Sequence, residues 1–154
     1  MIRYTTGNLL EANVEALVNA VNTVGVMGKG IALQFREQFP SNFRAYQQAC
    51  KAGTLHTGDL LIVEDGSLMY RKTIINFPTK AHWRGASRYE YITSGLIALR
   101  SAILERDIKS IAIPPLGCGN GGLHWEKVRP MIEEHLKDLD AEIIIYTPND
   151  QIKR

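Results

Sequence analysis

The feature that most constrains this chain is a strand-like run, a glycine-rich loop and a helix start, in that order, within residues 16–39. Residues 14–18 form an apolar run typical of a buried strand. Three glycines follow within residues 25–30, and apolar residues then recur four apart, as on one face of a helix. This order suits phosphate binding, because glycines let the backbone come close and the first N–H groups of a helix are unpaired.

The motif class of this loop stays open on the sequence alone. Its spacing does not match the dinucleotide fingerprint, and no Ser or Thr follows Lys29 as a Walker A loop requires. Glycine loops are also common as plain turns. Asn19 and Asn22 favour a ligand site, because they are expected where the strand ends and an amide can both donate to and accept from sugar hydroxyls. The alternative is that both asparagines cap turns.

A length of 154 residues predicts a single domain over residues 1–154. With 45% hydrophobic and 22% charged residues, the composition is that of a globular protein. A net charge of +2 is too small to indicate nucleic-acid binding by itself. Cys50 and Cys118 form neither a disulfide framework nor a zinc pattern, which fits a reduced, cytoplasmic compartment. We expect no metal, no signal peptide and no membrane-spanning segment.

Alternating strand and helix patterns predict a three-layer α/β domain. Strands are expected at residues 2–5, 14–20, 59–64, 68–77, 110–114 and 141–146. Ser41 is the expected N-cap of a helix over residues 42–51. A capping box over residues 87–90 should open a second helix with Ser87 as its cap. The Asp65-Gly66 pair is typical of a tight hairpin turn.

A second glycine loop, at residues 115–123, is the sharper signal. It has four glycines in six residues, follows a predicted strand and precedes a predicted helix. A loop of this kind can wrap backbone N–H groups around a diphosphate. Cys118 within it has the chemistry of a nucleophile, but no His lies in an obvious activating position, so we favour a packing role for it.

Four segments together resemble the macrodomain family, whose fold binds ADP-ribose. They are Gly7-Asn8-Leu9, residues 19–22, residues 27–32 and residues 115–123, and the resemblance runs in order over nearly the whole chain. Residues 28–32 and 76–80 resemble one branch, which includes the terminal ADP-ribose protein glycohydrolase and the DNA ADP-ribosyl glycohydrolases. Residues 21–32 are most similar to the DNA-acting members, which are antitoxins of DNA ADP-ribosyltransferase toxins. The resemblance implies an α/β/α fold with a mixed central sheet.

The resemblance also implies a role for individual residues. Lys80 would be catalytic, ADP-ribose the ligand, ADP-ribosylated single-stranded DNA the substrate and a cognate toxin the partner, with no cofactor. Asn8, Leu9 and Tyr146 would meet the adenine, and Asn22 the distal ribose. The full set expected to bind ADP-ribose is Asn8, Leu9, Asn19, Asn22, Gly28, Lys29, Gly30, Ile31, Pro115, Leu116, Gly117, Cys118, Gly119, Asn120, Gly121, Gly122, Leu123 and Tyr146.

Lys80 follows a predicted strand whose end should face the same sheet edge as Asn22 and both glycine loops. It could attack the anomeric carbon as a neutral amine, or donate a proton to the leaving base, and the sequence leaves both routes open. The protein-acting relative has an aspartate in the second glycine loop. This chain has Asn120 and Gly121 there, so the resemblance supplies no carboxylate partner for Lys80.

A basic, aromatic segment surrounds Lys80. Residues 71–91 contain five Lys or Arg and one acidic residue, with aromatic side chains between them. Positive charge follows a phosphate backbone and exposed aromatics stack on bases, so we predict nucleic-acid contacts from Trp83, Arg84 and Arg88. The alternatives are a loop anchor for Trp83 and an ordinary helix surface for Arg88. Two other functions also remain, a non-catalytic ADP-ribose-binding module and a hydrolase of ADP-ribose esters on protein carboxylates.

Overall fold

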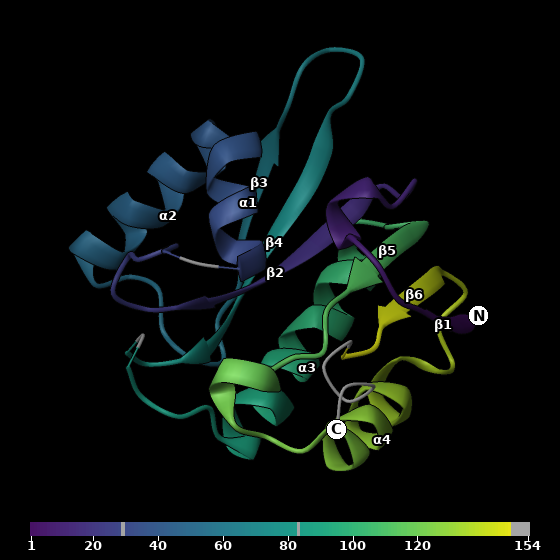
Figure 1. The fold of residues 1–154 in the computed structure, drawn as a ribbon. Coiled ribbons are helices and arrows are strands. Elements are labelled where there is room, and N and C mark those ends of the chain that lie inside the picture. The colour runs from purple at the N-terminus through teal and green to yellow at the C-terminus, as the bar shows by residue number, and fades with distance from the viewer. Residues whose placement is uncertain (29, 83, 149–154) are drawn as a thin grey trace.

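The computed structural model describes residues 1–28, 30–82 and 84–148. Its strands form one sheet in the order β1-β6-β5-β2-β4-β3 (Figure 1). The strands are β1 (Ile2–Thr5), β2 (Ala16–Asn22), β3 (Leu61–Asp65), β4 (Lys72–Lys80), β5 (Ser110–Ile113) and β6 (Glu142–Tyr146). The β3–β4 pair is antiparallel and the other neighbouring pairs are parallel, so the sheet is mixed, as predicted.

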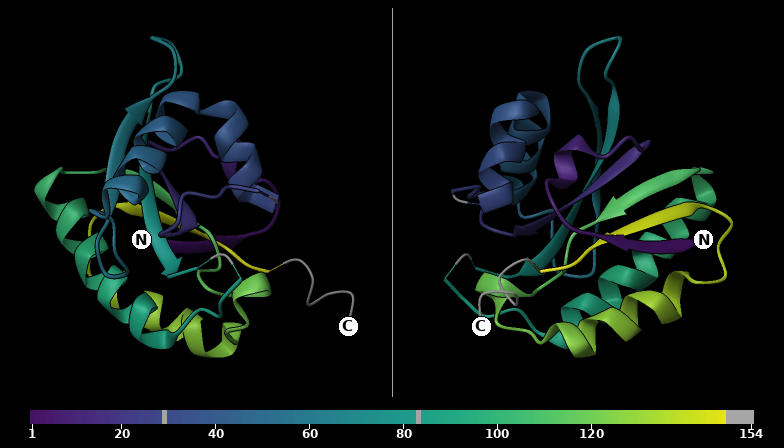
Figure 2. Two further views of the ribbon diagram at one scale, coloured as in Figure 1. Left: turned by 90° about the vertical axis from the view of Figure 1, so that its left-hand side faces the viewer. Right: turned by 45° about the vertical axis from the view of Figure 1, so that its right-hand side comes forward.

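Helices cover both faces of this sheet (Figure 2). They are α1 (Gly30–Gln38), α2 (Pro40–Ala52), α3 (Tyr89–Glu105) and α4 (Trp125–Leu136), with short 3-10 turns η1 (Leu9–Glu11) and η2 (Gly119–Gly121). Successive residues of a strand face opposite sides. Leu17 and Val21 of β2 therefore pack into the core beside α1 and α2, whereas Ala16 and Val18 pack beside α3 and α4. The predicted three-layer α/β/α fold is confirmed.

The parallel strands all end at one edge of the sheet. β1, β6, β5, β2 and β4 run in the same direction, so their carboxyl ends and the loops that follow lie together. Asn22 at the end of β2 is in register with Lys80 at the end of β4. This arrangement confirms that Lys80, Asn22 and the two glycine loops share an edge, where open α/β sheets bind ligands.

Several expected boundaries were wrong. β2 begins and ends two residues later than expected, so Asn22 is the last residue of the strand instead of following it. β4 begins later and continues to Lys80. The connection between β3 and β4 spans residues 66–71 and is not a two-residue turn. Asparagine was treated as a strand end, but in β2 a buried partner satisfies the Asn19 amide, which donates to Asn76 Oδ1 at 3.3 Å.

The two predicted serine caps were also wrong, and in each case a distant contact explains the difference. α2 begins at Pro40, and the Asp65 carboxylate of β3 accepts the backbone N–H of Asn42 at 2.7 Å, a first-turn N–H that the apolar N-cap residue Phe39 cannot bind through its side chain. α3 begins at Tyr89 without a side-chain cap. Ser87 is buried before it, and its backbone N–H donates to Gly121 O at 3.0 Å.

Three buried asparagines tie the sheet to α2. Asn19, Asn42 and Asn76 are fully buried. Asn76 Oδ1 accepts from the amides of Asn19 at 3.3 Å and Asn42 at 3.2 Å. Asn76 Nδ2 donates to Asn42 Oδ1 at 2.8 Å and Leu61 O at 3.0 Å. Buried amides are stable only when they are hydrogen-bonded, so this network fixes how β2, β3, β4 and α2 lie together.

We therefore expect Asn76→Ala to lower the free energy of unfolding by about 1–3 kcal/mol, because the buried amides of Asn19 and Asn42 lose their hydrogen bonds to Asn76. Urea denaturation measures this loss. Asn13→Ala, at an exposed asparagine, is the matched control and should leave the unfolding midpoint unchanged. Equal midpoints for the two variants would contradict a structural role for the network.

Candidate active site

The predicted site residues lie along the sheet edge in the order of the strands. Register places Tyr146 of β6 beside Thr5 of β1, from which the chain leads to Asn8. β5 leads into residues 115–123, and β2 and β4 bring Asn22 and Lys80. From β1 to β4 is four strand spacings, about 19 Å. The edge therefore forms a long site with the predicted adenine contacts at one end and Lys80 at the other.

At the β1–β6 end, Asn8 caps η1, because its Oδ1 accepts the backbone N–H of Leu10 at 3.1 Å. Asn8 is exposed and Tyr146 is half-buried. The Leu9 side chain is buried in the core, so a ligand can reach Leu9 only through its backbone. The contacts of these residues with adenine stay predictions.

The glycines of the second loop have two distinct functions. At Gly117 and Gly121 a Cβ atom would lie 2.6 Å from the Leu123 side chain and 2.4 Å from Ser87 Oγ, so packing demands glycine. Gly119 and Gly122 adopt φ values of +73° and +82°, and a Cβ there would meet open space. These two are the places where a ligand can approach the backbone, as the predicted diphosphate site requires.

The rest of this loop faces different surroundings. Leu116 is buried, Pro115 and Cys118 are half-buried, and Asn120 is exposed. Burial, with a smaller contribution from the nearby Glu126 carboxylate, raises the pKa of Cys118 to about 11. The thiol is then protonated at neutral pH and unreactive as a nucleophile, which supports the packing role.

Lys80 contacts the second glycine loop directly. Its Nζ donates a hydrogen bond to the backbone carbonyl of Asn120 at 3.1 Å. A Cβ built on Gly121 would lie 3.9 Å from Lys80 Cε. The structure therefore brings the predicted catalytic amine to the predicted diphosphate loop, where its partner is a backbone carbonyl. The catalytic role itself stays a prediction.

Asn22 holds the first loop in shape. Its Oδ1 accepts the backbone N–H groups of Val24 at 3.0 Å and Gly25 at 3.2 Å. It also accepts the Tyr46 hydroxyl at 2.7 Å, and its Nδ2 donates to Val26 O at 2.8 Å. This is the turn-capping alternative named above, while a ribose contact stays a prediction. The partner Tyr46 was missed, although a tyrosine on the core face of a helix signals that its hydroxyl has a partner.

The other residues predicted at the first loop differ in their exposure. Gly28 and Gly30 are exposed, and Ile31 is half-buried in the first turn of α1. Asn19 is fully buried beneath the loop, 3.8 Å from Met27 Sδ, and its Oδ1 has no partner among the described residues. Direct ligand contact by Asn19 stays a prediction. Lys29 lies outside the described residues.

The predicted nucleic-acid contacts are partly placed. Arg84 and Arg88 are exposed after β4 and before α3, whereas Trp83 lies outside the described residues. Within residues 1–28, 30–82 and 84–148, no three His, Cys, Asp or Glu side chains gather as a metal site would need. Over the same residues, each helix is too short or too polar to cross a membrane.

An α/β/α sandwich with a mixed central sheet and two glycine loops at one sheet edge is the architecture that the sequence resemblance implied. The model of the Macro domain family matches residues 18–132. The chain therefore belongs to the macrodomain family.

Within this family the chain is similar to DarG proteins. A DNA ADP-ribosyl glycohydrolase of Thermus aquaticus is 51% identical over 99% of this chain and 43% of its own length. The macrodomain of Mycobacterium tuberculosis DarG has a TM-score of 0.94 at 52% identity, over 97% of this chain and 99% of that chain. The chain spans less than half the length of the curated Thermus aquaticus relative.

A relative from Thermosipho africanus is named as a fusion of two enzymes. It is a DNA ADP-ribosyl transferase-DNA ADP-ribosyl glycohydrolase fusion protein, 37% identical over 92% of this chain and 40% of its own length. The structure of Thermosipho africanus DarTG in complex with ADP-ribose has a TM-score of 0.91 at 34% identity, over 97% of this chain and 42% of that chain.

We expect Gly119→Val to abolish ADP-ribose binding, because its side chain would fill the open space at the loop and valine disfavours a φ of +73°. Calorimetry measures the affinity, and the unfolding midpoint reports whether the fold survives. Thr93→Val, on the exposed surface of α3, is the control for the new side chain. A folded Gly119→Val protein with wild-type affinity would remove this loop from the site.

We expect Asn22→Ala to weaken ADP-ribose binding by about 1–3 kcal/mol, because the first loop loses the acceptor that organises it. Tyr46→Phe removes one of the same hydrogen bonds at a residue beneath the loop. A smaller loss of affinity in Tyr46→Phe indicates that loop shape matters for binding. Full affinity in Asn22→Ala, measured by calorimetry, would exclude Asn22 from the site.

Proposed function

We propose that this domain is a metal-independent ADP-ribosyl glycohydrolase that removes ADP-ribose from thymidine in modified DNA. The observation that carries the proposal is the hydrogen bond from Lys80 Nζ to Asn120 O, which holds an amine at the end of the sheet edge. The DNA substrate is supported by similarity to a DNA ADP-ribosyl glycohydrolase that is 51% identical over 99% of this chain.

The strand order supports one direction for the ligand. The adenine lies by Asn8 and Tyr146, and the diphosphate lies over Gly119 and Gly122, where the backbone faces open space. The distal ribose then reaches the pair of residues that register brings together at β2 and β4. In this direction the bond from ribose to thymine meets Lys80, and the DNA strand leaves at the β4 end of the site.

Two routes break that bond, and Lys80 serves in either one. As a neutral amine, Lys80 attacks the anomeric carbon, thymine leaves with the bonding electrons, and water then releases ADP-ribose. As an ammonium ion, it protonates thymine while water attacks the anomeric carbon. The Asn120 carbonyl accepts a hydrogen bond from the amine and so fixes the direction of Nζ in both routes. Backbone amides hold the charged phosphates, so affinity and chemistry depend on different groups.

In the cell this activity reverses the modification made by a DNA ADP-ribosyltransferase. A Thermosipho africanus relative is a fusion of such a transferase with a glycohydrolase, which supports a toxin and antitoxin pair. A toxin that modifies DNA acts where DNA is, and the proposed location is therefore the cytoplasm.

We expect Lys80→Ala to stop release of ADP-ribose from a modified single-stranded oligonucleotide while free ADP-ribose binds nearly as well as to wild type. Lys80→Arg should fail as well, because a guanidinium stays charged and cannot attack carbon. Single-turnover cleavage and a binding titration on the same protein preparations measure the two effects. Lys72→Ala, at the opposite end of β4, is the matched control for loss of a lysine.

Parallel assays on ADP-ribosylated protein separate the other functions. Near-normal cleavage by Lys80→Ala would refute its catalytic role. Loss of binding together with cleavage would make Lys80 a substrate-positioning residue. Wild-type protein that binds ADP-ribose but cleaves neither substrate would be a binding module, and cleavage confined to carboxylate esters on protein would identify the ester hydrolase.

A further inference from the structure

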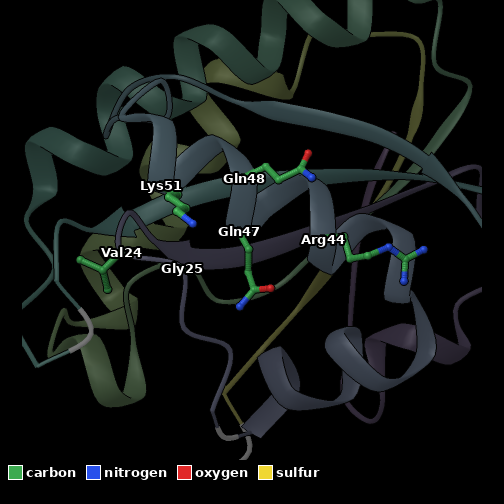
Figure 3. A pocket seen from close by; sticks show the side chains of 6 residues that line it. All are labelled: Val24, Gly25, Arg44, Gln47, Gln48 and Lys51. Carbon is green, nitrogen blue, oxygen red and sulfur yellow. The ribbon is translucent and has the colours of Figure 1, made fainter.

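A polar stripe runs along the outer face of α2. Arg44, Gln47, Gln48 and Lys51 are spaced three, four and seven residues apart, which places them on one side of a helix. With Val24 and Gly25 they line an open cavity of about 540 Å³ (Figure 3). All four residues of the stripe are exposed. Over its length the stripe spans about 10.5 Å.

The charge around this stripe is one-sided. Residues 16–58 contain four Lys or Arg and a single acidic residue, Glu37, whereas the whole chain has 18 basic and 16 acidic residues. α2 contains no Asp or Glu. Arg44 donates to Ser41 Oγ at 3.0 Å, which is a neutral partner, and Arg44 forms no ion pair with the residues that the structure describes. Two cations with two amide groups between them offer donors to an anionic chain with repeated acceptors, such as a phosphate backbone.

One loop connects this stripe to the candidate active site. A Cβ built on Gly25 would lie 3.5 Å from Cys50 Cβ and 4.0 Å from Gln47 Cα, so the loop rests directly on α2. The Gly25 N–H is held by Asn22, which is in register with Lys80. On the inner side of α2, the Tyr46 hydroxyl holds the same asparagine. A DNA strand that leaves Lys80 and crosses this loop would therefore reach the stripe on α2.

We propose that the α2 stripe binds the phosphate backbone of the DNA strand next to the modified nucleotide. This inference rests on the proposed function, because it extends the substrate beyond the ADP-ribose site. Arg44 and Lys51, about 10.5 Å apart along the helix axis, are far enough apart to contact two different phosphates of one strand. The stripe then adds affinity for a modified oligonucleotide that free ADP-ribose does not gain.

The test uses Lys80→Ala protein and a fluorescent single-stranded oligonucleotide with one ADP-ribosylated thymidine. Its affinity is measured by anisotropy over a salt series, with and without the double substitution Arg44→Ala/Lys51→Ala. The control is Arg106→Ala/Lys109→Ala, which also removes two positive charges. Both residues lie between α3 and β5, at the edge of the sheet opposite the site. Free ADP-ribose is titrated against each protein, and cleavage by the corresponding proteins with Lys80 intact is measured separately.

We expect Arg44→Ala/Lys51→Ala to weaken oligonucleotide binding and to lower the salt slope by about 1.4, because each phosphate contact on a single strand contributes about 0.7. Free ADP-ribose affinity and the control protein should be unchanged. A slope equal to the control would overturn the inference, as would oligonucleotide binding no tighter than that of free ADP-ribose. Failure of the protein with Lys80 intact to cleave would refute only the proposed function, since the slope comparison uses binding alone.

Discussion

The site depends on the parallel pairing of β2 with β4. This pairing runs in regular register from Ala16 opposite Thr73 and shifts by one residue between Val21 and Asn22. The shift brings Asn22 into backbone register with Lys80, so the residue that organises the first loop and the predicted catalytic residue end neighbouring strands. A slip of one residue would turn every side chain of β4 to the other face of the sheet, and Lys80 would lose the second glycine loop.

The buried asparagines make this register specific. An all-apolar interface between β2 and β4 could pack in several registers, since any Val or Ile fits a pleated surface. Asn76 instead has definite partners in Asn19 and Asn42, and a shifted strand would leave those amides unpaired in the core. Each unpaired amide costs about 1–3 kcal/mol, which is a large share of the stability of a single domain. The polar network thus fixes the strand register on which the position of the site depends.

The sequence predicted the parts of the structure that local pattern determines. The pattern at residues 87–90 predicted a helix there, which α3 confirms, and the glycine loops were expected at the edge where the parallel strands end. Both signals are local, because their residues lie close together in the sequence. Prediction from the sequence failed where a contact between residues far apart in the chain determines the local structure. Asp65 caps α2 in place of the predicted Ser41. The backbone N–H of Ser87 bonds to Gly121 O, and Ser87 does not cap α3. Tyr46 was missed in the same way, since its partner Asn22 is 24 residues away.

The second glycine loop is shaped by packing before any ligand arrives. Leu123 and Ser87 exclude side chains at Gly117 and Gly121, and that fixes the path on which Gly119 and Gly122 present backbone to open space. A preformed loop loses little conformational entropy on binding, so more of the phosphate interaction appears as affinity. The carbonyl of Asn120 in this loop also accepts from Lys80. Loop shape and amine position are therefore coupled, and under the proposed function a diphosphate bound to the loop would also fix the direction of the amine.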